Sequence, residues 1–185
     1  MSVIALAGIG LVVWGLVTLD WVRIATGVVA FLAAAAWDYY KKRAAFRPDV
    51  FTVYQPLHKL VHVADEAIRS ANAGGDRQKI DVARALLFAG MIDAASQGAG
   101  LSDKDFIALF AAVFQDMNYS DEARNQVIMF HQARELTKPG YAAIMTGGDL
   151  YTKFAKGRHH IIMTAGLVVQ QFVDDPTFPT SISAL

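Results

Sequence analysis

Residues 1–40 read MSVIALAGIGLVVWGLVTLDWVRIATGVVAFLAAAAWDYY and form the most apolar part of the chain. Residues 3–18 and 24–37 are almost wholly apolar, and the charged residues Asp20 and Arg23 lie between these two runs. Such runs are typical of segments that enter a bilayer. We therefore predict that residues 1–40 anchor the chain in a membrane.

Two geometries would place these residues in a bilayer. A straight helix over residues 3–37 would be about 50 Å long, against roughly 30 Å of hydrocarbon. It would also leave Asp20 and Arg23 near the bilayer centre, where each costs about 2.5–3.5 kcal/mol. We favour a hairpin of two short transmembrane helices, with Trp21 and Trp37 at the membrane interface. Each span is barely long enough to cross a bilayer. A hairpin in a locally thinned membrane and a kinked, partly re-entrant helix therefore remain as alternative geometries.

Small residues recur on one face of each predicted span. Gly27, Ala30 and Ala34 follow the spacing i, i+3, i+7, and Gly8 and Gly15 are seven residues apart. In lipid, small residues allow the close backbone approach that drives helix association. We expect these five residues to pack against the other span, a second copy or a partner subunit.

Aromatic and basic residues follow the second run. Basic residues beside a span favour the cytoplasmic side of a membrane. We therefore expect both the N-terminus and the larger C-terminal part in the cytoplasm, at a bacterial inner membrane. The predicted interfacial residues after the span are Tyr39, Tyr40, Lys41, Lys42 and Arg43.

Composition limits what the remaining residues do. The chain has 185 residues, of which 54% are hydrophobic and 18% are charged, and its formal net charge is zero. It is too apolar to be disordered and has no basic excess for nucleic acid. The absence of cysteine excludes disulfides, thiol catalysis and zinc–thiolate sites.

After the anchor, the sequence predicts an all-α fold. Residues 41–56 are expected to be a basic juxtamembrane linker, in which Pro48 and Pro56 bracket an extended or irregular piece, FTVYQ. Residues 57–175 are expected to form a soluble bundle of about six helices, and residues 176–185 a tail. Apolar spacing and capping residues predict helices over residues 57–71, 76–96, 103–117, 121–136, 141–156 and 159–173.

Local breaks separate these predicted helices. Ser102 and Ser120 each precede acidic residues, as expected of a helix start. Lys138-Pro139-Gly140 predicts a turn, and the pair Gly147-Gly148 is expected to weaken the helix that contains it.

Residues 83–135, ARALLFAGMIDAASQGAGLSDKDFIALFAAVFQDMNYSDEARNQVIMFHQARE, resemble the TerB-like helical domains associated with tellurite resistance. The resemblance lies in an apolar helix, a small-residue loop and two serine-capped acidic helix starts. It implies a small helical interaction domain. TerB-like domains typically carry Ala-Asp-Gly at the end of the first helix, whereas residues 94–98 here read AASQG. This departure argues against a metal-linked acidic site.

Two groups of side chains are candidates for chemistry. His58 and His62 are spaced i, i+4, and Asp65 and Glu66 follow one turn later, a spacing that can hold a divalent ion. The apolar face of that helix uses other positions, so the favoured interpretation is a solvated surface. A basic cluster could contact lipid headgroups or an acidic partner, although a solvated helix end is commoner; it contains Lys153, Lys156, Arg158, His159 and His160.

The sequence favours a non-catalytic role. We predict a membrane-anchored accessory or scaffold subunit of a larger membrane complex that acts through helix-mediated contacts. Its expected partners are membrane lipid and other protein subunits, including a second copy, without nucleic acid or a cofactor. The alternatives are a TerB-like stress or metal-response module and a histidine-dependent metalloenzyme.

Overall fold

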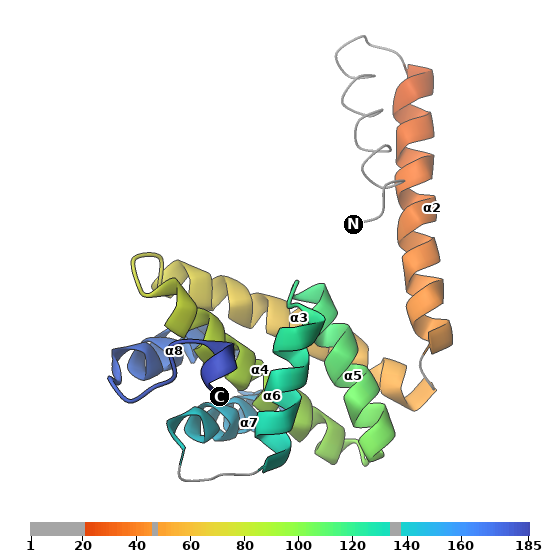
Figure 1. The fold of residues 1–185 in the computed structure, drawn as a ribbon. Coiled ribbons are helices and arrows are strands. Elements are labelled where there is room, and N and C mark those ends of the chain that lie inside the picture. Colours follow the sequence, from red (N-terminus) through yellow and green to blue (C-terminus); the bar gives the residue numbers. More distant parts are fainter. Residues whose placement is uncertain (1–20, 46–47, 134–137) are drawn as a thin grey trace. The chain divides into compact units, whose positions relative to one another are not determined.

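The computed structural model describes residues 21–45, 48–133 and 138–185. Its regular structure in these residues is entirely helical, which confirms the all-α prediction for this part of the chain (Figure 1). The chain divides into two units, Met1–Phe51 and Thr52–Leu185. The helices are α2 (Trp21–Ala45), α3 (Pro48–Ala71), α4 (Arg77–Gly98), α5 (Asp103–Asp116), α6 (Asp121–Ala133), α7 (Pro139–Ala155) and α8 (Ala165–Asp174), with 3-10 helices η1 (His159–Thr164) and η2 (Ile182–Ala184).

Helix α2 contains the second of the two predicted membrane segments. It is continuous past Trp37 and ends at Ala45, so the basic residues 41–43 belong to the helix and not to a linker. Within the described ranges, no helix combines the length and the apolar character needed to cross a membrane. The first predicted segment, with Gly8 and Gly15, lies outside the described residues.

The predicted extended piece before residue 57 is wrong, because α3 begins at Pro48 and includes Pro56. A proline inside a helix removes one backbone hydrogen bond and is normally unfavourable. Here the buried stripe of α3 continues on both sides of Pro56, through Tyr54 before it and Leu57 and Val61 after it. Burial of this continuous stripe outweighs the local cost of the proline.

The helix starts predicted from side-chain caps are confirmed. The Oγ atom of Ser102 accepts a hydrogen bond from the amide of Asp105 at 3.3 Å, and that of Ser120 accepts from Ala123 at 3.1 Å. Asp76 caps α4 in the same way through the amides of residues 78 and 79. These contacts satisfy amides that the first helical turn leaves without intrahelical partners.

The C-terminal third departs from the prediction in three places. Pro139 and Gly140 form the first turn of α7 and not a separate turn, since proline suits the first helical position. The last predicted helix begins as the 3-10 helix η1 and becomes α-helical only at Ala165. The tail is anchored, because Phe178 is 2% exposed and stacks on Phe172 with ring centroids 5.4 Å apart.

Helix α4 lies at the centre of the second unit. It contacts α5, α6, α7 and α8, and every residue from Ala85 to Ile92 is buried. A helix that is apolar on all sides needs neighbours on all sides. The run ALLFAGMI therefore fixes α4 as the core element of this unit.

The backbones of α4 and α7 meet directly at glycine. A Cβ atom at Gly90 would overlap the carbonyl group of Ile144, and one at Gly147 would overlap the carbonyl group of Leu87. The glycine pair that was expected to weaken α7 is thus the surface through which α7 packs on α4. Similarly, a Cβ atom at Gly166 of α8 would overlap Ala67 and Ala71 of α3.

We predict that Gly90→Ala or Gly147→Ala lowers the free energy of unfolding by about 3 kcal/mol, because each added methyl group forces two helix backbones apart. Gly98→Ala in the last turn of α4 is the matched control, since a Cβ atom there meets nothing within 4 Å. Urea denaturation followed by circular dichroism measures the change. Equal stability of the three variants would contradict direct backbone packing.

Candidate functional site

The predicted histidine pair is part of a small polar cluster. His58 and His62 of α3 have their Nε2 atoms 3.1 Å apart, and the Nε2 atom of His58 lies 3.4 Å from Oδ2 of Asp116 in α5. The hydroxyl of Tyr54 donates a hydrogen bond to the same carboxylate oxygen. Tyr54, His58 and His62 are each one turn apart on α3, so one face of this helix supplies three of the four groups.

The two acidic residues of the predicted metal site, Asp65 and Glu66, do not lie beside the histidines. Asp65 was expected on the solvated face, but it is 6% exposed and pairs with arginines instead. Glu66 is exposed and lines a neighbouring groove. Among the residues that the structure describes, no group of three or more histidine and acidic side chains has the arrangement needed to hold a metal ion.

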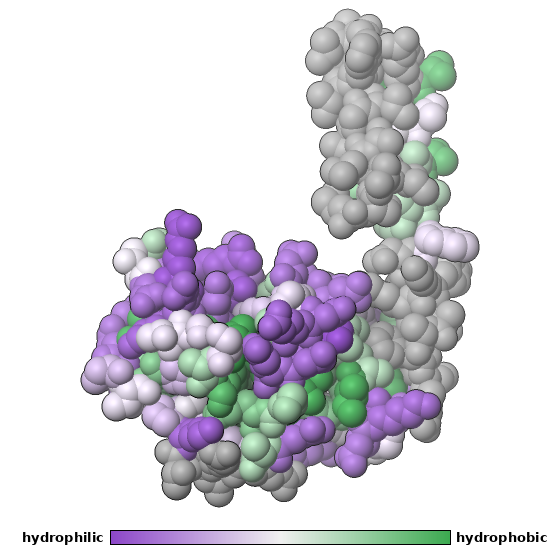
Figure 2. Space-filling model, viewed as in Figure 1, coloured by the Kyte–Doolittle hydropathy of each residue, from purple (hydrophilic) through white to green (hydrophobic). Residues whose placement is uncertain are grey.

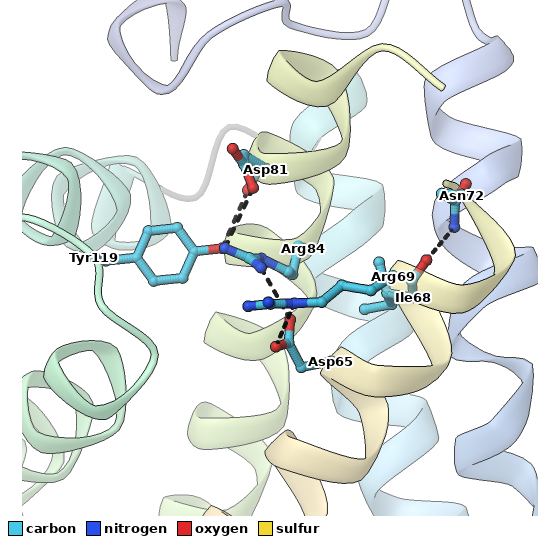
Figure 3. Close-up of polar contacts among 7 residues, drawn as sticks. All are labelled: Asp65, Ile68, Arg69, Asn72, Asp81, Arg84 and Tyr119. Carbon is cyan, nitrogen blue, oxygen red and sulfur yellow. Dashed lines mark hydrogen bonds and ion pairs between the residues drawn. The ribbon is translucent and has the colours of Figure 1, made fainter. Parts of the chain in front are cut away.

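Asp65 belongs to an ion-pair network centred on Arg84 (Figure 3). Its Oδ1 atom lies 3.0 Å from Nη1 of Arg84, and its Oδ2 atom lies 2.9 Å from Nε of Arg69. Nη2 of Arg84 lies 3.2 Å from Asp81, and Nε of Arg84 donates to the hydroxyl of Tyr119 at 2.7 Å. The network joins α3 and α4 to the segment between α5 and α6.

Burial shapes the electrostatics of this network. Burial disfavours the charge on Arg84, but Tyr119, Asp65 and Asp81 outweigh it, so the pKa of Arg84 is raised above its ordinary value. Burial also raises the pKa of Tyr119, although Arg84 partly opposes the shift. The guanidinium therefore stays charged and the phenol stays protonated at neutral pH. Both groups are held as fixed structural partners and do not exchange protons.

An open groove of about 730 Å³ lies between these two clusters. One wall comes from α3 and the other from the end of α5 and the turn after it. Its charges are mixed, and the carboxylate of Asp65 already faces two arginines. The lining therefore contains three carboxylates and one guanidinium, and one of these carboxylates, that of Asp65, is neutralised by its arginine partners. The lining residues are His62, Val63, Asp65, Glu66, Arg69, Ser70, Asp116, Met117 and Asn118.

Another histidine, His131, is buried against α4. His131 of α6 is 8% exposed, and its Nε2 atom lies 3.4 Å from Oδ2 of Asp93. Its Nδ1 atom is buried without a hydrogen-bond partner, and its ring packs 5.5 Å from that of Phe106. This arrangement connects α6 to α4.

The predicted membrane residues have a consistent pattern of exposure on α2. Gly27 and Ala34 are buried and Ala30 is half-buried, whereas Trp21 and Trp37 are 76% and 73% exposed. Residues 39–43 lie in the last turns of α2. In the second unit, the predicted basic cluster is exposed except at Lys153, which pairs with Asp149.

Several polar residues of these clusters were missed by the sequence analysis. Arg84, Tyr119 and Asp116 lie on different elements from their partners, so their spacing carries no sign of the contacts. The sequence spacing indicates only the ion pairs within one helix. Asp81 and Arg84 are three residues apart, and Asp65 and Arg69 are four residues apart.

We predict that Arg84→Met destabilises the second unit by about 3–5 kcal/mol, because it leaves the buried carboxylate of Asp65 without its least exposed partner. Arg124→Met is the matched control and should cost no more than about 1 kcal/mol, since Arg124 pairs with the exposed Asp121. Urea denaturation measures both. Equal losses would show that the network around Arg84 contributes no more than a surface pair.

Comparisons with known proteins do not place the chain in a family. No protein-family model, no curated protein and no solved structure matches it. The resemblance of residues 83–135 to TerB-like domains stays a prediction.

Proposed function

We propose that the chain is a non-catalytic, membrane-anchored accessory or scaffold subunit of a larger membrane complex. Residues 1–40 form the anchor as two short helices, and the helical unit on the cytoplasmic side of a bacterial inner membrane makes contacts with partner subunits. The observation that carries this proposal is the apolar surface of α2.

The described part of α2 exposes seven large apolar side chains: Trp21, Val22, Val28, Val29, Phe31, Leu32 and Trp37. At 3.6 residues per turn, they spread over about two thirds of the helix circumference. A helix on the surface of a water-soluble protein instead confines its apolar residues to one stripe that faces the core. Green residues along the visible side of α2 in Figure 2 illustrate this exposure. Lipid is the environment that best suits such a helix.

The ends of the apolar part support the same proposal. Trp21 and Trp37 are separated by about 24 Å along the helix axis, at 1.5 Å per residue. Exposed tryptophans at both ends of an apolar segment are typical of the two membrane interfaces. The basic residues 41–43 follow the second tryptophan and favour a cytoplasmic position for the rest of the chain.

A contact role is supported by how the polar groups of the second unit are used. Asp65, Arg84 and Tyr119 bind one another and present no reactive group to solvent. Exposed apolar side chains such as Val63 and Ile107 offer surface to partner subunits instead. On α2, the covered small residues Gly27 and Ala34 support helix packing within the membrane.

Cysteine labelling tests the anchor, because the chain has no native cysteine. Val29→Cys on α2 and Met145→Cys on α7 are matched variants, since the native side chains are 65% and 60% exposed. In membranes opened on both sides, a water-soluble maleimide should label position 145 readily and position 29 only after detergent is added. Rapid labelling of both positions before detergent would contradict the proposal.

A metal-response module is the second candidate, and one observation favours it. The Nε2 atom of His58 lies 3.1 Å from that of His62 and 3.4 Å from Oδ2 of Asp116, so a small rearrangement would bring three metal-binding groups together. This candidate includes the TerB-like interpretation.

Elemental analysis of the purified full chain separates the two candidates. Under the proposed scaffold function we expect no stoichiometric zinc, because Asp116 is already bound to Tyr54 and His58. One equivalent of zinc that is lost in the His62→Ala variant would favour the metal-response module.

A further inference from the structure

Basic and histidine side chains cluster where α7 ends and η1 begins. Residues 153–160 contain Lys153, Lys156, Arg158, His159 and His160 and no aspartate or glutamate, and the nearest carboxylates in the sequence are those of Asp149, Asp174 and Asp175. The turn after α7 is therefore locally basic in a chain with a net charge of zero.

The charges of this segment are directed to solvent. Lys156, Arg158, His159 and His160 are all exposed. Among the residues that the structure describes, the ion pair of this segment joins Lys153 to Asp149 at 2.5 Å. Gly157 adopts a left-handed conformation, with φ of 85°, and follows α7 between the exposed cations Lys156 and Arg158. The turn therefore presents Lys156 and Arg158 on either side of a sharp change in chain direction.

An exposed apolar ridge continues from these charges. Met163 and Leu167 are 63% and 66% exposed. Met163 lies three residues after His160 within η1, and Leu167 lies four residues after Met163, in α8. These spacings place successive side chains on one face of the two helices. The opposite face is buried through Ile162, Ala165 and Val169. The exposed methionine and leucine are thus fixed by a packed helix and project into solvent.

We infer that this surface, defined by Lys156, Arg158, His159, His160, Met163 and Leu167, docks on an anionic bilayer. Cations beside exposed apolar side chains are the combination that binds membrane interfaces, because the charges meet anionic headgroups while the apolar side chains enter the acyl boundary. The inference extends the proposed function, since it gives the helical unit a membrane contact of its own beside the anchor.

An acidic protein is the competing partner for such a surface. The basic turn at residues 156–160 suits either partner, but the apolar ridge of Met163 and Leu167 favours lipid. A bilayer provides both negative charge and an apolar layer a few ångströms deeper, which Leu167 and Met163 are positioned to reach. The proposed anchor would also keep the helical unit close to the membrane at all times, where a weak contact is sufficient.

A fluorescent probe on the ridge tests the inference in the full chain. Leu167→Cys carries an environment-sensitive nitrobenzoxadiazole label, and the protein is reconstituted in nanodiscs of phosphatidylcholine with or without phosphatidylglycerol. We expect a blue shift and quenching by lipid-attached nitroxide only in the discs that contain phosphatidylglycerol, with reversal by high salt. Met129→Cys on α6 is the matched control, because Met129 is 70% exposed, and its probe should not respond.

A variant with reversed charge tests whether the response at position 167 depends on the exposed cations. Lys156→Glu with Arg158→Glu should abolish the response at position 167 while circular dichroism stays unchanged, since both side chains are exposed. A probe at position 167 that responds equally in both disc types, or not at all, would overturn the inference. A response to soluble polyglutamate but not to phosphatidylglycerol would also overturn it and assign the surface to an acidic protein.

Failure of the inference and failure of the proposed anchor give different results. A chain that elutes with the discs while the probe at position 167 stays aqueous contradicts only the docking surface. A chain that does not elute with the discs contradicts the anchor. In that case the same probes are measured with phosphatidylglycerol vesicles, where the response at position 167 is still expected and its absence overturns the inference.

Discussion

The second unit depends on the direct backbone contact between α4 and α7. Gly90 and Gly147 each face a carbonyl group of the other helix, so neither position has room for a side chain. This approach helps to bury residues 85–92 of α4 on all sides, because α5, α6 and α8 cover what α7 leaves open. Close contact of two helix backbones maximises dispersion contacts but tolerates no added volume. The geometry of the whole unit is therefore set at two glycines.

The polar residues are arranged around this apolar centre. Arg84 connects the outer edge of α4 with α3 and the segment after α5, and His131 connects α6 with Asp93 further along α4. In both places charged or polar groups hold neighbouring helices at defined positions. The proposed functions lie outside this framework, on the apolar surface of α2 and on the exposed ridge of η1 and α8.

Local signals in the sequence predicted the helices well, and contacts between helices explain where prediction failed. Ser102 and Ser120 cap helices through amides only three residues away, so their role is visible in sequence. Pro56 and Gly147 carry local penalties that only burial against other helices offsets. The buried partner of Asp65, Arg84, lies on another helix, and no spacing within α3 indicates it. The partners of Asp116 likewise lie outside α5. The candidate histidine pair was found because i, i+4 spacing is local, whereas the acidic group beside it came from another helix.

Native-state hydrogen exchange tests most directly whether the α4–α7 contact holds the unit together. Amides that open only through global unfolding exchange most slowly. We predict that residues 85–92 of α4 and 144–148 of α7 belong to this slowest class and exchange with one common free energy equal to that of global unfolding. Faster exchange of these amides than of those in α5 and α6 would contradict a core organised around the glycine contact.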